Sequence, residues 1–246
     1  MLFPAASGQG VKIAVIDSGV NIAHPHITAP VTRVNLGAPE EGASQDDTLG
    51  HGTAVMAAIQ EKAPAAEYFA LKLFGASLRT TTERLLQAIE WAVTNRMDVI
   101  NLSLGTTRLE ARSLFEDLVD RAWSNGGVLV SAREASPRTL LPGSLPRVIG
   151  VDVDWEIPRD RYRIATVGSG RTFFASGYPR SLPGVPPARN LNGISFAVAN
   201  MTGFVARACE GLRERSFDSI HAALANEIRE QASPPLENSG EPVLPV

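Results

Sequence analysis

The chain has 246 residues, a formal net charge of −3 at pH 7 and a sequence pI of about 5.9. A chain of this length buries a substantial core, and α/β folds of this size form one domain. The slight acidic excess excludes the basic footprint of a nucleic-acid-binding domain, and no apolar run is long enough to span a bilayer. We therefore expect neither nucleic acid nor a membrane as a partner.

Cysteine usage and the first residues bear on the cellular compartment. Cys209 is the only cysteine, so no disulfide within the chain is expected, and its place on a predicted helix favours a buried thiol. The first ten residues hold no cationic segment followed by a long apolar stretch. The sequence thus predicts a cytoplasmic protein with neither a signal peptide nor a propeptide.

Strand-like and helix-like segments alternate along the chain. Apolar runs typical of strands occupy residues 11–16, 67–73, 98–103, 127–132 and 147–153, and helical patterns occupy residues 52–61, 81–95, 109–125, 195–212 and 219–231. This alternation predicts βαβ units, and hence an α/β fold with a mainly parallel sheet flanked by helices. We expect one domain over residues 1–232, followed by a proline-punctuated extended tail over residues 233–246.

Three short segments contain residue types that work together in nucleophilic catalysis. Asp17 ends an apolar run before a Ser-Gly turn signal, His51 begins His-Gly-Thr-Ala-Val, and Ser195 lies within Asn-Gly-Ile-Ser-Phe-Ala. A serine hydroxyl is a poor nucleophile at neutral pH and needs a neighbouring base. An imidazole serves as that base when a carboxylate holds its tautomer from the other ring nitrogen. The three residues are therefore candidates for nucleophile, base and orienting acid.

A fourth segment, Ser103-Leu104-Gly105, follows the predicted strand 98–103. With these four segments, in the chain order Asp, His, Ser, residues 11–211 resemble the subtilisin-like serine proteases, or subtilases. The resemblance implies a three-layer fold, a triad of Asp17, His51 and Ser195 that cleaves peptide bonds through an acyl-enzyme, and no cofactor. It also implies a peptide or protein substrate that pairs with Ser103, Leu104 and Gly105 as an added strand.

The segment after the predicted strand 127–132 departs from the family. Subtilases place an asparagine there whose side chain donates to the oxyanion, whereas this chain has Ser136 at the aligned position. Ser136, Arg133 and Asn192 are candidate substitute donors beside the backbone N–H of Ser195. Loss of such a donor costs about 10²–10³ in turnover. Three interpretations stay open: a substitute donor, a slow specialised enzyme, or a protein that has kept binding and lost proteolysis.

The same resemblance gives expectations about the substrate pocket and about metals. Arg133, Glu134 and Leu140 are expected to narrow the pocket for the substrate residue before the cleaved bond. The insertion in which relatives hold a tight calcium ion is missing after residue 59, so we expect no metal. Asp46 and Asp47 are adjacent acidic residues, which we interpret as solvated rather than as cation ligands.

The sequence therefore predicts an intracellular serine endopeptidase dedicated to maturation of one peptide or protein. A transpeptidase or cyclase uses the same triad and differs only in whether an amine or water resolves the acyl-enzyme. A non-catalytic or weakly active peptide-binding homologue is the alternative from a different class. The oligomeric state and the cleavage site do not follow from the sequence, and the tail 233–246 is a candidate occupant of the substrate groove.

Overall fold

The computed structural model describes residues 1–36, 46–75, 77–135, 138–167 and 170–232. Its centre is an eight-stranded sheet of order β2-β3-β1-β4-β5-β8-β10-β9. Its strands are β1 Lys12–Asp17, β2 Val31–Asn35, β3 Glu67–Lys72, β4 Val99–Leu102, β5 Val128–Ala132, β8 Ile149–Val153, β9 Tyr162–Val167 and β10 Gly170–Ala175. Neighbouring strands are parallel except for the antiparallel pair β9 and β10. The predicted α/β fold is confirmed.

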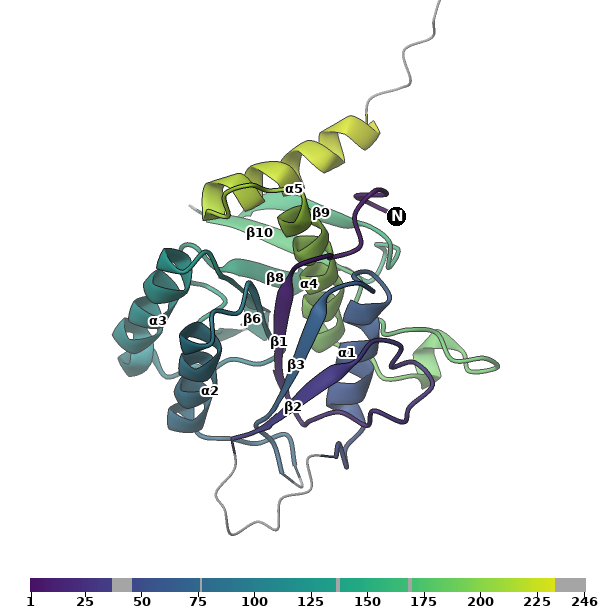
Figure 1. Cartoon of the computed structure of the whole chain (residues 1–246), viewed down its shortest axis with the longest axis horizontal. Helices are drawn as coiled ribbons and strands as arrows, with labels where there is room; N and C mark the ends of the chain where they lie inside the picture. The colour runs from purple at the N-terminus through teal and green to yellow at the C-terminus, as the bar shows by residue number, and fades with distance from the viewer. Residues whose placement is uncertain (37–45, 76, 136–137, 168–169, 233–246) are drawn as a thin grey trace, which may run out of the picture.

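Helices cover both faces of the sheet (Figure 1). They are α1 His51–Gln60, α2 Thr82–Thr94, α3 Arg112–Ser124, α4 Ile194–Glu210 and α5 Phe217–Ala232, with short 3₁₀ turns η1 Leu109–Ala111 and η2 Pro187–Arg189. The core residues of α1, α4 and α5 belong to one buried cluster, and those of α2 and α3 belong to a second cluster across the sheet. The sheet is therefore the middle of three layers.

Side chains alternate across β1, and both of its faces are buried. Ile13 and Val15 pack with the cluster of α1 and α4, whereas Ala14 and Ile16 pack with the cluster of α2 and α3. Strands of a parallel sheet read as continuous apolar runs because helices cover both faces. For this reason the central strands were visible in the sequence.

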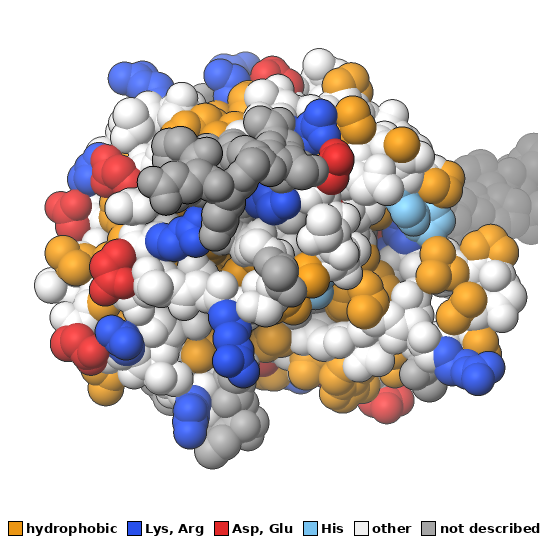
Figure 2. Space-filling view, turned by 90° about the horizontal axis from the view of Figure 1, so that it is seen from below, with side chains coloured by type: hydrophobic (Ala, Val, Ile, Leu, Met, Phe, Trp, Pro, Cys, Tyr) orange, Lys and Arg blue, Asp and Glu red, His pale blue; other side chains and the backbone are white. Residues whose placement is uncertain are grey.

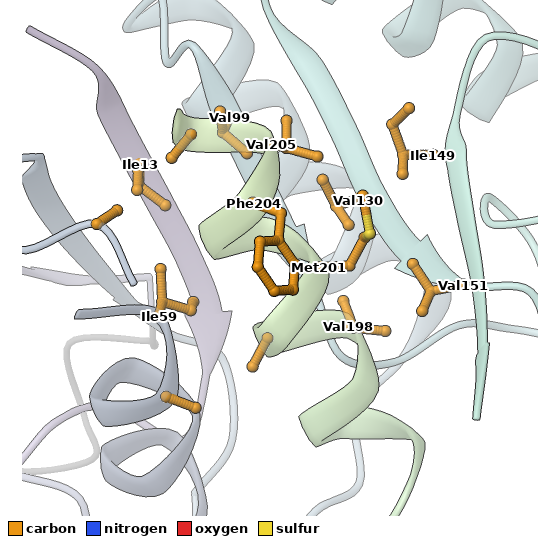
Figure 3. Packing of buried hydrophobic residues seen from close by; sticks show 14 of the residues in the cluster. Ile13, Ile59, Val99, Val130, Ile149, Val151, Val198, Met201, Phe204 and Val205 are labelled. Atoms are coloured by element: carbon orange, nitrogen blue, oxygen red, sulfur yellow. The ribbon is translucent and has the colours of Figure 1, made fainter. Parts of the chain in front are cut away.

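Helix α4 crosses the sheet with most of its length buried. Figure 3 shows Met201 and Phe204 of α4 between Ile13 of β1 and Val130 of β5. A Cβ atom at Gly203 would lie 2.6 Å from Cβ of the buried Lys62, so only glycine permits this approach. This packing explains why a glycine occupies a mid-helix position, although glycine there destabilises a helix by up to about 1 kcal/mol.

Several elements were not predicted. Strand β2 lies at one edge of the sheet, the β9–β10 hairpin lies at the other, and β6 Glu134–Ala135 pairs with β7 Arg138–Thr139 in a separate two-stranded sheet. Edge strands and hairpins carry polar side chains and lack the long apolar runs on which the prediction depended. The predicted tail, residues 233–246, lies outside the described residues.

Candidate active site

The carboxyl ends of the central parallel strands meet at one edge of the sheet, which faces down in Figure 1 and toward the viewer in Figure 2. Asp17 is the last residue of β1, and its side chain is 1% exposed. His51 is the first residue of α1, and its Nδ1 lies 2.8 Å from Oδ1 of Asp17. Because a carboxylate only accepts, Nδ1 carries the hydrogen and Nε2 is left with a lone pair.

Gly52 allows α1 to approach the end of β1. A Cβ atom at this position would lie 2.3 Å from the carbonyl oxygen of Gly19 and 3.2 Å from Cβ of Asp17. Contacts below 3 Å force the backbone apart, so any other residue would displace His51 from Asp17. The glycine after the histidine is therefore a geometric requirement of the pair.

Burial and charge act in opposite directions on His51. Burial alone lowers the pKa of the imidazole, because it penalises the charged form. The hydrogen bond and charge of Asp17, together with the charge of Asp47, outweigh burial and hold the pKa of His51 above its ordinary value. The pair thus stabilises the imidazolium that a general base becomes when it takes a proton.

Ser195 is the second residue of α4, so it lies at the positive end of a 17-residue helix. Gly193 precedes the helix at φ 143°, a conformation that favours glycine, and its N–H donates to the carbonyl oxygen of Gly177 at 2.9 Å. No side chain of the described residues caps this helix. The first-turn N–H groups of α4 are therefore directed where an anion would be stabilised.

Ser195 and Ser103 form a reciprocal pair. The Ser195 hydroxyl donates to the Ser103 carbonyl oxygen at 3.3 Å, and the Ser103 hydroxyl donates to the Ser195 carbonyl oxygen at 3.2 Å. The ring of His51 lies 5.7 Å from that of Phe196, which follows Ser195. Proton transfer to His51 requires the Ser195 hydroxyl to turn away from Ser103, and such bonds often tighten only with substrate bound.

A buried hydrogen-bond chain fixes Ser103. The side-chain oxygen of Asn101 accepts from the hydroxyl of Thr202 at 2.8 Å, and its nitrogen donates to the hydroxyl of Ser103 at 3.2 Å. These residues belong to β4, to α4 and to the segment after β4. This chain of hydrogen bonds ties α4, which carries the candidate nucleophile, to the predicted substrate-binding segment.

Leu140 packs directly against the predicted substrate-binding segment. Thr106 and Leu141 exchange two backbone hydrogen bonds, at 2.9 and 2.8 Å, and bring the two segments side by side. A Cβ atom at Gly105 would lie 2.9 Å from Cβ of Leu140, whose side chain is 9% exposed. Leu104, between Ser103 and Gly105, is half-buried, and its carbonyl oxygen accepts from the hydroxyl of Ser131.

The three candidate oxyanion donors have different surroundings. Ser136 lies outside the described residues. Arg133 donates to Glu134 at 3.0 Å and lies 3.6 Å from Asp152, so its guanidinium is engaged with carboxylates. The Asn192 side chain donates to the carbonyl oxygen of Asn190 at 3.2 Å. Both described candidates would have to leave these partners to reach an oxyanion.

The structure revises the interpretation of Asp47 as a solvated acid, whereas Asp46 is exposed to solvent as expected. Asp46 pairs with Arg33 at 2.8 Å, and its carbonyl oxygen accepts from Lys72 at 2.7 Å. Asp47 is half-buried and accepts five hydrogen bonds around the start of α1. An acidic residue a few positions before a predicted helix, here residues 52–61, is a capping signal, and this was the available clue.

Comparison with known proteins identifies the class. The profile of the subtilase family, Peptidase S8, matches residues 8–138. Subtilisin BL of Lederbergia lenta is 31% identical over 95% of this chain and 89% of its own length. The minor extracellular protease Epr of Bacillus subtilis (strain 168) is 36% identical over 51% of this chain, which spans only 20% of Epr. The chain therefore belongs to the subtilase family, a class of subtilisin-like serine peptidases that are hydrolases.

A solved structure gives a more particular likeness. The prenylagaramide maturation protease PagA aligns with a TM-score of 0.68 and 25% identity, covering 91% of this chain and 84% of PagA. This agreement extends the subtilisin-like architecture over nearly the whole chain.

The described residues contain neither a candidate membrane span nor a candidate metal centre. No helix within them combines the length and the apolar character that a bilayer span requires. Nor do three or more His, Cys, Asp or Glu side chains gather there into a group that could hold a metal ion.

Proposed function

We propose that this protein is a serine endopeptidase in which Ser195 is the nucleophile, His51 the general base and then acid, and Asp17 the residue that orients His51. The observation that carries the proposal is the 2.8 Å contact between His51 and the buried Asp17, on the sheet edge where α4 presents Ser195. An acid, a base and a hydroxyl at one edge of the sheet are the groups that acyl transfer by a serine requires, and this supports the proposal.

The reaction follows from these positions. A peptide lies extended along Ser103, Leu104 and Gly105, and Nε2 of His51 takes the proton of Ser195 as its oxygen attacks the carbonyl carbon. The Asp17 carboxylate stabilises the imidazolium, which then protonates the leaving amine. Water, activated by the same imidazole, releases the acyl group from Ser195.

The oxyanion is stabilised first by the N–H of Ser195 at the start of α4. For the second donor, three candidates remain in the proposal: Ser136, Arg133 and Asn192. Arg133 and Asn192 have present partners that they would exchange for substrate. An exchange of this kind makes turnover slow until the correct substrate supplies the binding energy for the rearrangement.

The substrate is proposed to be one peptide or protein that the enzyme matures inside the cell. PagA is by its name a maturation protease, and this chain shares its architecture. The packing of Leu140 against Gly105 favours a narrow pocket and selective cleavage. The single cysteine, Cys209, is buried and suits a reducing compartment, and cell fractionation tests this location.

A fluorophosphonate probe tests the chemistry without knowledge of the substrate, because it reacts only with an activated serine. We expect stoichiometric labelling of the wild type at Ser195 and none in Ser195→Ala, with nearly unchanged melting temperatures. Ser113→Ala, on the exposed face of α3, is the matched control and should label like the wild type. A folded wild type that resists the probe would support the peptide-binding alternative instead.

A further inference from the structure

We propose that Asp47 is a positioning residue that locks the start of α1, and with it His51, against Asp17. The inference rests on the proposed function for its kinetic consequence. Among the described residues, no hydrogen bond joins the Asp47 carboxylate directly to His51 or to Asp17. Asp47 acts on them through the backbone at the start of α1 and through Ser18.

Asp47 organises the turn that leads into α1. Its Oδ1 accepts from the backbone N–H groups of Leu49 and Gly50, at 3.0 and 2.9 Å. Its Oδ2 accepts from the N–H and the hydroxyl of Thr53, at 2.8 and 2.7 Å. These bonds hold residues on both sides of His51, so the carboxylate fixes the backbone that carries the imidazole.

Ser18 links the same carboxylate to Asp17. The Ser18 hydroxyl donates to Oδ1 of Asp47 at 2.8 Å and accepts from the N–H of Gly52 at 2.9 Å. The Ser18 N–H donates to Oδ1 of Asp17 at 2.8 Å, the same oxygen that accepts from His51. One short chain of bonds therefore joins the orienting acid, the turn and the helix of the base.

Five donors converge on the two oxygens of Asp47, and this explains why a carboxylate is needed. An asparagine of the same shape offers one oxygen and one NH₂ group, so its NH₂ group would face N–H or O–H donors whichever way it is placed. The expected result is a turn that opens by a fraction of an ångström. Misplacement of a catalytic group by about 1 Å costs about 100-fold in rate.

Asp47 also acts on His51 through its charge. The titratable groups that act on the imidazole are Asp17 at the end of β1 and Asp47 before α1, and the neighbouring ring from α4 is the apolar Phe196. Both carboxylates raise the pKa of His51. Loss of the Asp47 charge should therefore lower the pKa of His51, which a purely structural role for Asp47 would not do.

Asp47→Asn is the test, and Asp46→Asn is the matched control with the same chemical change one residue away. Two readouts are needed: the second-order rate constant for fluorophosphonate labelling as a function of pH, and the pKa of the His51 ring by NMR, assigned with His51→Gln. We expect Asp47→Asn to slow labelling about 10- to 100-fold and to lower the pKa of His51. Asp46→Asn should leave both readouts as in the wild type.

Ser18→Ala separates geometry from charge and replaces Asp47→Asn as the test if that variant does not fold. It removes the link between Asp47 and Gly52 but keeps the carboxylate, so labelling should slow about fivefold while the pKa of His51 stays unchanged. Wild-type labelling and an unchanged His51 pKa in Asp47→Asn, or wild-type labelling in Ser18→Ala, would overturn the proposal.

The NMR readout distinguishes this inference from the proposed function. If the folded wild type does not react with the probe, yet the pKa of His51 falls in Asp47→Asn and not in Asp46→Asn, the endopeptidase proposal fails while the role of Asp47 stands. If the wild type reacts and neither readout changes in Asp47→Asn, the endopeptidase proposal stands and the role of Asp47 fails.

Discussion

His51 is placed where burial and the nearby carboxylates act in opposite directions on the pKa of an imidazole. Its side chain is 17% exposed, enough to meet a substrate, while the carboxylate beneath it is almost fully buried. A buried carboxylate bound to Nδ1 stabilises the positive charge of the imidazolium and leaves the lone pair of Nε2 free to accept a proton. The raised pKa of His51 thus follows from the same contact with Asp17 on which its proposed role as a base rests.

The pH dependence of labelling tests this balance at the residue scale. Only neutral His51 accepts a proton, and its pKa lies above 6.5, so the labelling rate should rise with pH through a midpoint above 6.5. Asp17→Asn should lower the rate about 10⁴-fold, because the amide no longer holds the productive tautomer. Rates measured between about pH 5 and about pH 9 check both expectations.

Asp120→Asn serves as the control for that experiment, because Asp120 pairs with Arg147 on the exposed surface of α3. Its profile should superimpose on that of the wild type. A wild-type midpoint at or below 6.5 would contradict the stated effect of Asp17 on His51.

Single residues were predictable where chemistry alone limits the choice. Acyl transfer by a hydroxyl needs a base and an orienting acid, so Asp17, His51 and Ser195 could be proposed from residue type and order. Asp47 could not be assigned in this way, because the chemistry of acyl transfer does not require a carboxylate at its position. Four of its five donors come from residues 49–53, which fits the capping signal before the helix, but the fifth is the hydroxyl of Ser18, a contact that only the fold shows.

At the scale of elements, α4 is the part of the fold that connects stability with the active site. It begins at the candidate nucleophile and continues through the core between β1 and β5 (Figure 3). Any change in how α4 packs along its length therefore reaches Ser195.

Gly203→Ala tests this packing. Alanine favours a helix by about 1 kcal/mol over glycine, yet the new Cβ would lie 2.6 Å from Cβ and 2.9 Å from Cδ of Lys62. Overpacking of this kind costs about 1–3 kcal/mol, so the net effect on the free energy of unfolding should be destabilising. Urea unfolding measures the change.

Gly211→Ala is the matched control at the end of the same helix. Gly211 has φ −80°, and its nearest neighbour to an added Cβ is the carbonyl oxygen of Ala208 at 4.0 Å. This variant should be neutral or slightly stabilising. If Gly203→Ala proves as stable as Gly211→Ala, the close approach of α4 to Lys62 is not a constraint.

Central elements were predictable and peripheral ones were not, for a physical reason. Strand β4, Val99–Leu102, is buried on both faces, and all of its residues except Asn101 are apolar. Strand β9, Tyr162–Val167, lies at the sheet edge, where Arg163 stacks on the ring of Phe174 and remains half in solvent. The pairing partner of such a strand, and not its own composition, decides that it forms.

At the scale of the whole molecule, the face that carries the candidate site mixes charged, polar and apolar side chains (Figure 2). Asp46 and Asp47 already have protein partners on this face. We therefore expect the melting temperature to be the same in chelator and in millimolar calcium, because both oxygens of Asp47 accept from protein donors and Asp46 pairs with Arg33. A rise of several degrees with calcium would show a cation site that this interpretation lacks.

The N-terminal segment is fastened to the far end of α4, close to α5 (Figure 1). One oxygen of Glu210 accepts from three consecutive backbone N–H groups, those of residues 7–9, at 2.6, 2.6 and 3.0 Å. Arg207, one turn earlier, donates to the carbonyl oxygens of Leu2 and Phe3. The N-terminal segment and the end of α4 are about 200 positions apart in the chain, so the local sequence does not predict this contact.

Glu210→Gln tests the clamp through its pH dependence. Burial raises the pKa of the Glu210 carboxyl, but the backbone donors of residues 7–9 and the charge of Arg207 outweigh it and hold the pKa below 4.5. A carboxyl whose pKa is lower in the folded than in the unfolded protein stabilises the fold at pH values above the unfolded-state pKa. This stabilisation is lost as the pH falls through the folded-state pKa. The variant should therefore lose about 1 kcal/mol of unfolding free energy at neutral pH, a figure discounted for solvent screening.

The loss should shrink as the pH falls from 4.5 through the lower pKa of the folded carboxyl, because the wild-type carboxylate is then itself protonated. Glu214→Gln makes the same change at an exposed position beyond α4 and should match the wild type at every pH. Urea unfolding from neutral pH down to about pH 3 measures both differences. A loss that stays constant with pH would mean that the charge of Glu210 does not contribute to stability. Equal stability of both variants at neutral pH would mean that the segment is held by Arg207 without Glu210.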